Sequence, residues 1–206
     1  MPAAPASPYP RTPALDRLVA AVEAALGDPA LEGERARAEA IRPALAELLA
    51  EPDSVAVEAC SDLDGGAVGN LLHADPAGRF HVLAVVFPEG TSSGVHHHGC
   101  WGVIGYLRGG DQETRYRARP GTGAATRLEE TERQVWHQGD ITFLLPEDGE
   151  GWHRVRNPGP GTGVSIHVLC RLPADHPHKF WDRVSGAVSD YPFVEVASGR
   201  WRATLP

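Results

Sequence analysis

The chain is short of cysteine, since Cys60, Cys100 and Cys170 are the only three among 206 residues. So sparse and odd a set does not build a disulfide framework, and we expect all three thiols to be reduced and packed. Basic residues are also few: 19 Lys and Arg stand against 27 Asp and Glu, and the formal net charge is −8. Without a basic patch, neither a nucleic acid nor an anionic membrane is expected as a partner.

Long apolar runs are lacking as well. No stretch of the sequence approaches the roughly 20 apolar residues that a membrane span requires. The first residues do not show the charged-then-apolar layout of a signal sequence. We therefore expect a cytoplasmic protein with no membrane partner.

Composition divides the chain into three parts. Residues 1–12 begin with MPAAPASPYP, which is rich in Pro and Ala, has little to bury and predicts a mobile tail. Residues 13–52 have helical patterns, and residues 53–206 have strand patterns with a C-terminal extension. The length suffices for one domain with a sizeable core.

Two helices are predicted in the second part. Thr12 can cap the first one, apolar residues recur at helical spacing, and Gly27 ends it. The second helix runs from about Glu34 to Ala50, with Pro43 either kinking it or starting its main segment. Both helices are expected to pack outside the β structure that follows.

From Ser54 onward, short apolar runs alternate with Gly, Pro, Asp and Asn. Many short strands with turn signals between them predict an all-β sandwich or barrel. Residues 173–206 have mixed signals, for which we expect a short helix and an edge strand. The predicted strands of the barrel are VAVEA, NLLHA, RFHVLAVVF, WGVIGYL, QETRYRA, TRLEE, RQVWH, ITFLL, HRVRN and GVSIHVLC.

Three consecutive histidines separate two of these strand-like runs. In a strand, His96 and His98 point to one face and His97 to the other, unless a one-residue slip of register exchanges the faces. Two imidazoles on one face can bind one ion, and imidazole suits Zn, Cu, Fe and Ni better than Mg or Ca. The best candidate for a third ligand is His153 in GWHRVRN.

Together the two blocks resemble the motifs of the cupin superfamily. The resemblance implies a double-stranded β-helix, or jelly-roll, barrel with a metal in its mouth. Gly102 stands where the family has a Glu, and the spacing from Gly139 to Pro146 is one residue longer than usual. The positions in register are Gly90, His96, His98 and Gly109 in the first motif, and His153 and Asn157 in the second.

The missing Glu leaves a neutral three-His site, the departure seen in the cysteine dioxygenase-like thiol dioxygenases. Bacterial members are similar over Leu71–Phe80, Val95–Gly109, His153–Asn157 and Ser165–Val168. The resemblance implies Fe(II) bound by His96, His98 and His153, with O2 and a small thiol as substrates and a sulfinate as product. Ser165 and His167 match the first two members of the family's Ser-His-Tyr triad, so the resemblance implies a catalytic role for both.

Two departures bear on the substrate. Leu169 replaces the triad Tyr, so a crosslink from Cys100 to that position is not expected; Tyr106 and Tyr116 are alternative phenols. Gly69 falls where the family has a carboxylate-binding Arg or Gln. We therefore expect a small thiol other than cysteine. A second reading is a three-His cupin that oxygenates or rearranges a non-thiol intermediate, and a third is a non-catalytic small-molecule binder.

The remaining polar and aromatic residues are expected to be structural or solvated. Trp101, Trp136 and Trp152 are expected in the core or a pocket wall. Candidate anchors for a substrate anion are Arg79, Arg108, Arg115, Arg154 and Arg171. Surface or core positions are expected for His73, His81, His137, His176 and His178.

Overall fold

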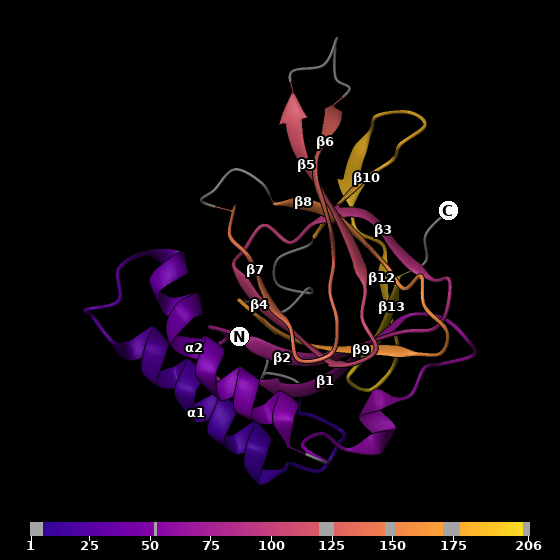
Figure 1. Ribbon diagram of the computed structural model, residues 1–206. Helices are drawn as coiled ribbons and strands as arrows, with labels where there is room; N and C mark the ends of the chain where they lie inside the picture. Colours follow the sequence, from indigo (N-terminus) through magenta and orange to yellow (C-terminus); the bar gives the residue numbers. More distant parts are fainter. Residues whose placement is uncertain (1–5, 52, 120–125, 147–150, 171–177, 204–206) are drawn as a thin grey trace.

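The computed structural model describes residues 6–51, 53–119, 126–146, 151–170 and 178–203 (Figure 1). Two helices, α1 (Pro13–Gly27) and α2 (Gly33–Ala50), and a 3-10 helix, η1 (Val57–Cys60), precede the strands. The strands are β1 (Val68–Ala74), β2 (His81–Phe87), β3 (Ser92–His97), β4 (Gly102–Arg108), β5 (Gln112–Arg119), β6 (Arg127–Val135), β7 (Ile141–Leu144), β8 (Trp152–Arg156), β9 (Gly163–Leu169), β10 (Lys179–Trp181), β11 (Val188–Asp190), β12 (Phe193–Ala197) and β13 (Arg200–Ala203).

The strands form two antiparallel sheets that face each other. One sheet has the order β12-β13-β1-β2-β9-β4-β7, and the other has the order β11-β10-β3-β8-β5-β6. Within them, the consecutive strands β2 to β9 give β2-β9-β4-β7 opposite β3-β8-β5-β6, which is the strand order of an eight-stranded jelly roll. The predicted all-β jelly-roll barrel with N-terminal helices packed outside is confirmed.

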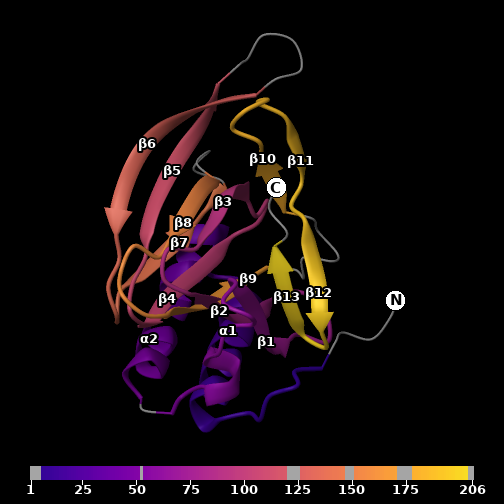
Figure 2. The same cartoon turned by 90° about the vertical axis from the view of Figure 1, so that its right-hand side faces the viewer.

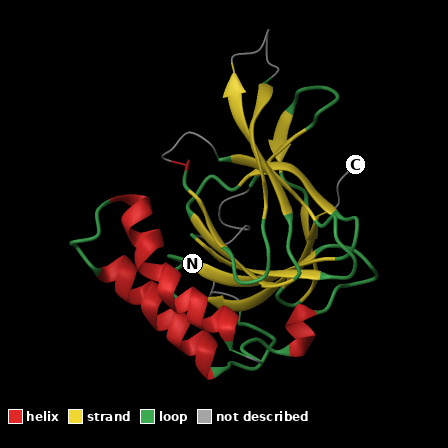
Figure 3. Cartoon of the chain, viewed as in Figure 1, coloured by secondary structure: helices red, strands yellow, loops and turns green. Residues whose placement is uncertain are grey.

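The helices cover the outer face of the seven-stranded sheet (Figure 3). Thr12 caps α1 as predicted, because its Oγ1 accepts a hydrogen bond from the Leu15 amide at 3.2 Å. Pro43 lies inside α2 without ending it. Gly105 of β4 allows α2 to approach closely, since a Cβ there would lie 2.7 Å from Leu49. Helix and sheet thereby share one hydrophobic core.

Part of the expected tail contacts this body. The Ser7 hydroxyl donates a hydrogen bond to the Leu71 carbonyl at 2.8 Å. The Tyr9 hydroxyl donates to Asn70 Oδ1 at 2.9 Å. Residues 7–9 of the predicted mobile tail are therefore held against β1, because polar groups of both segments satisfy one another.

Two details of the predicted strands and the predicted C-terminal helix were wrong. VAVEA forms η1 over its last part instead of a strand. TRLEE and RQVWH join into the single strand β6, whose side chains are mostly exposed. The expected C-terminal helix is replaced, within residues 178–203, by the four strands β10 to β13.

These C-terminal strands lengthen both sheets on the same side of the barrel (Figure 2). Strands β10 and β11 continue the six-stranded sheet from β3, while β13 and β12 continue the seven-stranded sheet from β1. The C-terminal extension therefore forms part of the wall around the space between the two sheets. Among the described helices, none has the length and apolar character needed to cross a membrane.

Candidate metal centre

Strand register brings the three predicted ligands together. His96 of β3 pairs directly with His153 of β8, and His98 follows at the end of β3 on the same face. The Nε2 atoms of His96 and His98 lie 2.9 Å apart. His153 Nε2 lies 3.1 Å from each of the other two. All three imidazoles are buried, with exposed fractions of 6%, 6% and 1%. Three ring nitrogens thus converge on one point.

The hydrogen bonds of the outer ring nitrogens show that this cluster suits a cation. His153 Nδ1 donates to the carboxylate of Glu113 at 2.9 Å, and His96 Nδ1 faces the Gly94 carbonyl at 3.3 Å. Both Nε2 atoms then carry lone pairs, since a neutral imidazole has one N–H. Facing lone pairs repel unless a cation lies between them. Nitrogens about 2.1 Å from one ion, at right angles to each other, are about 3.0 Å apart, which matches the observed spacing.

Protonation favours the same role. Burial lowers the pKa of both His96 and His98 well below the ordinary value, and neighbouring histidines lower it further. Both rings are therefore neutral near pH 7. A metal requires neutral imidazole, so no proton has to be displaced from these two ligands.

Glu113 supports the cluster and was missed in the sequence. Its Oε1 accepts the hydrogen bond from His153, while Oε2 accepts hydrogen bonds from Trp136 Nε1 at 3.0 Å and Arg115 at 3.1 Å. Burial raises its pKa, but these donors outweigh burial and hold the pKa at about 2. An ionised carboxylate on the far nitrogen fixes the tautomer and orientation of a ligating His. The alternation of Glu113 and Arg115 within QETRYRA was the available signal, yet only the β5–β8 register places them beside His153.

His97 points away from the cluster, as the strand alternation predicts. Its ring lies against Trp152, with 5.4 Å between ring centroids. A Cβ on Gly151 would lie 2.1 Å from His97 Nε2, so the absence of a side chain there makes room for the imidazole. The register with His96 and His98 inward is the one the structure adopts.

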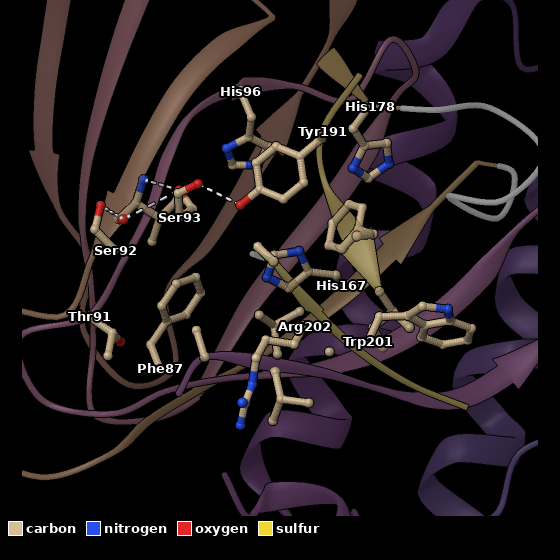
Figure 4. Close-up of a pocket in the computed structure, with 18 of the residues that line it drawn as sticks. Phe87, Thr91, Ser92, Ser93, His96, His167, His178, Tyr191, Trp201 and Arg202 are labelled. Carbon is tan, nitrogen blue, oxygen red and sulfur yellow. Dashed lines mark hydrogen bonds between the residues drawn. The ribbon is translucent and has the colours of Figure 1, made fainter. Parts of the chain in front are cut away.

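Ser165 and His167 lie together on β9, near the three histidines. Ser165 Oγ and His167 Nε2 are within hydrogen-bonding distance at 2.9 Å. Burial lowers the pKa of His167 to about 3, so this ring is neutral as well. His167 lines the same cavity as the three histidines, between the two sheets (Figure 4).

The cavity has a volume of about 350 Å³, and its walls apart from the histidines are largely apolar. Leu169 is fully enclosed, and a Cβ on Gly102 would lie 2.5 Å from its Cδ2. Leu169, which stands at the expected Tyr position, thus fills the space next to Gly102, which stands at the expected Glu position. Gly69 lines the wall without a donor group. The apolar lining includes Leu83, Val85, Phe87, Leu169, Phe193 and Trp201.

The C-terminal extension contributes side chains that the sequence did not indicate. His178, expected to be a structural histidine, lines the cavity with its ring 4.3 Å from that of His98. Tyr191 lies over His96 at 5.0 Å between centroids, and its hydroxyl donates to the Ser93 carbonyl at 2.5 Å. Aromatic residues in HKFW and DYPF were a signal for a packed wall, but nothing local indicated which cavity they face.

Tyr106 and Tyr116 do not line this cavity, so neither supplies its phenol. Cys100 lies outside the cavity too, with its thiol donating to the Cys170 carbonyl at 2.9 Å. The neighbouring Cys170 thiol and burial raise the pKa of Cys100, and the described cysteines are free thiols. His73 contacts Arg11, His81 is buried in β2 and His137 is exposed, while His176 lies outside the described residues.

None of the candidate anion anchors within the described chain lines the cavity. Arg79 pairs with Asp75 at 2.9 Å, and Arg108 donates to the Cys60 carbonyl at 3.1 Å. Arg115 is engaged with Glu113, Arg154 lies on β8, and Arg171 lies outside the described residues. Trp101 is in the core shared with the helices, whereas Trp136 and Trp152 contact Glu113 and His97.

Several solved structures are similar to parts of this chain at low sequence identity. No family model matches the chain. A double-stranded β-helix protein from Klebsiella pneumoniae is 18% identical, with a TM-score of 0.43 over 68% of this chain and 99% of that one. An RmlC-like cupin from Shewanella frigidimarina is 18% identical, with a TM-score of 0.40 over 56% and 85%. A cupin 2 conserved barrel protein from Rhodopseudomonas palustris is 18% identical, with a TM-score of 0.39 over 61% of this chain and 75% of that one, so the solved structures similar to this chain include proteins described as cupins.

Proposed function

We propose that the protein is a non-haem Fe(II) enzyme that uses O2 to oxidise a small thiol other than cysteine to its sulfinate. The observation that carries this proposal is the convergence of three buried Nε2 atoms within 2.9–3.1 Å of one another. Imidazole donors suit Fe, Zn, Cu and Ni. His96, His98 and His153 would hold the ion, and bound Fe(II) would supply the chemistry that joins a thiolate to O2.

The charge of the site favours an anionic ligand. No Asp or Glu is among the described residues that line the cavity, and the carboxylate of Glu113 is hydrogen-bonded to the outer nitrogen of His153. A divalent cation bound by three neutral imidazoles would keep a net charge of +2, because none of its protein ligands is negatively charged. A thiolate is compensated better there than beside a ligating carboxylate.

Side chains around the cluster position the reactants and exclude water. Neutral His167, hydrogen-bonded to Ser165, presents a polar group to an otherwise apolar wall and can hold a proton on one ring nitrogen. Leu169 and Phe193 keep that wall dry. In the overall reaction the thiol sulfur gains both atoms of O2, and the thiol proton leaves with the sulfinic acid. Ser165 and His167 are the proposed catalytic residues.

The direct experiment is oxygen uptake by the Fe(II)-loaded protein with a panel of thiols that includes cysteine and 3-mercaptopropionate. We expect sulfinate formation with one or more panel members, equimolar oxygen consumption and poor turnover of cysteine. His97→Ala is the matched control, because this ring lies on the opposite face of β3 from His98. Efficient cysteine turnover, with kcat/KM above about 10⁴ M⁻¹s⁻¹, would contradict the substrate assignment.

The size and apolar lining of the cavity favour a second candidate function. A volume of about 350 Å³ exceeds the needs of the smallest thiols and falls in the range of ligand pockets. A three-His metal enzyme that oxygenates or rearranges a non-thiol intermediate fits the same walls. Metal binding without oxygen uptake on any thiol would favour this candidate. Failure to bind any metal would instead leave a non-catalytic small-molecule binder.

A further inference from the structure

Arg202 is the one fully charged side chain that the described walls of the cavity contain. Apart from the histidines, no other Lys, Arg, Asp or Glu is among the described lining residues. Its side chain is 28% exposed, whereas His153 is 1% exposed. Arg202 therefore stands toward the open end of the cavity and the histidines at the closed end. In Figure 4, His167 lies between His96 and Arg202.

The guanidinium of Arg202 is only partly engaged within the protein. One terminal nitrogen donates to the Leu63 carbonyl. The same nitrogen lies 3.8 Å from a carboxylate oxygen of Asp64, whose side chain is 84% exposed. Arg202 Nε is buried and has no hydrogen-bond partner in the described part of the chain. A buried N–H of a cation without an acceptor is costly unless a ligand supplies one.

Arg200, two residues earlier on β13, differs from Arg202. Its Nε donates to Asn70 Oδ1 at 2.8 Å, and a terminal nitrogen donates to the Ser61 carbonyl at 3.1 Å. Arg200 thus anchors β13 to β1 and the segment before it. In Arg202, one terminal nitrogen donates to a backbone carbonyl, whereas Nε has no hydrogen-bond acceptor in the described part of the chain. The Nε–H is therefore available to an external carboxylate.

Gly66 leaves space beside that edge. A Cβ built on Gly66 would lie 3.2 Å from Arg202 Nε and 3.3 Å from its Cζ, and Gly66 itself lines the cavity. A larger residue at this position would press on the guanidinium. Because Gly66 has no side chain, the space next to Arg202 Nε contains no Cβ.

We propose that Arg202 anchors the carboxylate of a substrate whose other end lies at the three histidines. The ligand class is an ω-substituted carboxylic acid with an apolar middle section, because Leu83, Val85 and Trp201 line the same cavity as Arg202 and the histidines. A single guanidinium with an available Nε–H donor matches the charge and geometry of one carboxylate. The inference rests on the proposed function only in placing the reacting group of this substrate at the histidines.

The anchor is tested on the full-length, metal-free chain with hexanoate and its neutral analogue hexanamide, by calorimetry and tryptophan fluorescence. We expect wild type to bind hexanoate about 10- to 100-fold more tightly than hexanamide, and Arg202→Met to abolish that preference. Arg202→Lys, which keeps the charge but loses Nε, should retain part of it. Gly66→Ala should reduce it. The matched control is Arg119→Met, since Arg119 is an exposed arginine paired with Glu129, and it should leave the preference unchanged.

The same ligands separate a failure of the anchor from a failure of the proposed function. Absence of hexanoate binding, equal affinities for the acid and the amide in wild type, or a preference that survives in Arg202→Met would overturn the anchor. In a second arm, 6-mercaptohexanoate is titrated anaerobically into the Fe(II)-loaded protein. If hexanoate binding depends on Arg202 but the thiol adds no affinity on iron, the anchor stands and the thiol function fails.

Discussion

The two faces of β9 contact different parts of the molecule. Val164, Ile166 and Val168 point to the helices and belong to the hydrophobic core shared with α1 and α2. Ser165, His167 and Leu169 alternate with them, and His167 and Leu169 line the cavity. One strand therefore supplies stability with one set of side chains and the candidate site with the other. Substitutions on the two faces should be separable by measurement, although both sets are buried.

Removing one of the three converging histidines should have the largest effect. We expect His98→Ala to lower metal affinity by more than about 100-fold, beyond the loss expected for a supporting residue, because a three-point site loses one arm. His97→Ala should keep the metal, since its ring packs on Trp152. Metal content after dialysis against a mild chelator measures both. Equal metal loss in the two variants would mean that the inward register is wrong.

On the helix face of β9, the effect should fall on stability alone. Ile166 is fully buried in the core with the helices. We expect Ile166→Ala to reduce the free energy of unfolding by about 2–5 kcal/mol, through lost burial and a cavity. Urea denaturation gives this value, and metal stoichiometry at low temperature should stay that of wild type. A variant that is stable but fails to bind metal would contradict the separation of the two faces.

A substitution of Glu113 tests whether metal binding by the three histidines depends on a group outside the cavity. We expect Glu113→Gln to weaken metal binding about 10- to 100-fold, because the neutral amide orients and polarises His153 less than a carboxylate does. Competition with a chromophoric chelator would quantify this affinity. An affinity equal to that of wild type would show that the hydrogen bond to His153 has no part in metal binding.

The smallest effect is expected at Asp75, on the turn that follows β1. Hydrogen bonds from Arg79 lower the pKa of Asp75 below its ordinary value of 3.8. A depressed pKa stabilises the folded state at pH values above 3.8, and this contribution is lost as the pH falls through the folded-state pKa. Because the Arg79 side chain is 44% exposed, we expect Asp75→Asn to cost only about 1–2 kcal/mol at pH 7. The difference should shrink near pH 3 in urea melts; a constant difference would contradict the assignment.

Local patterns were sufficient to predict most of the barrel. Period-2 alternation and turn residues located β2, β4, β7, β8 and β9, and the cap at Thr12 located α1. The same alternation placed His96 and His98 together and His97 apart. Where the prediction was wrong, partners far along the chain decided the structure: β13 pairs with β1, and β10 pairs with β3, across more than a hundred and about eighty residues respectively.

The supporting part of the site needed the register between strands. Arg115 pairs with His153 in the register of β5 and β8, and Glu113 is two residues away on β5. Glu113 is therefore close to His153 only because β5 lies beside β8. Tyr191 and Arg202 enter the cavity because the C-terminal strands extend both sheets. A sequence pattern gives the face of a strand, but not the strand that will lie next to it.

Metal stoichiometry of the full-length protein is the most direct test of the three-histidine centre. After anaerobic loading with Fe(II) and removal of excess metal, elemental analysis should give about one iron per chain, as expected for a single cluster of three converging ligands. Substoichiometric or absent metal after loading with Fe, Zn, Cu and Ni in turn would contradict the account, because three facing imidazole nitrogens would then be stable without a cation.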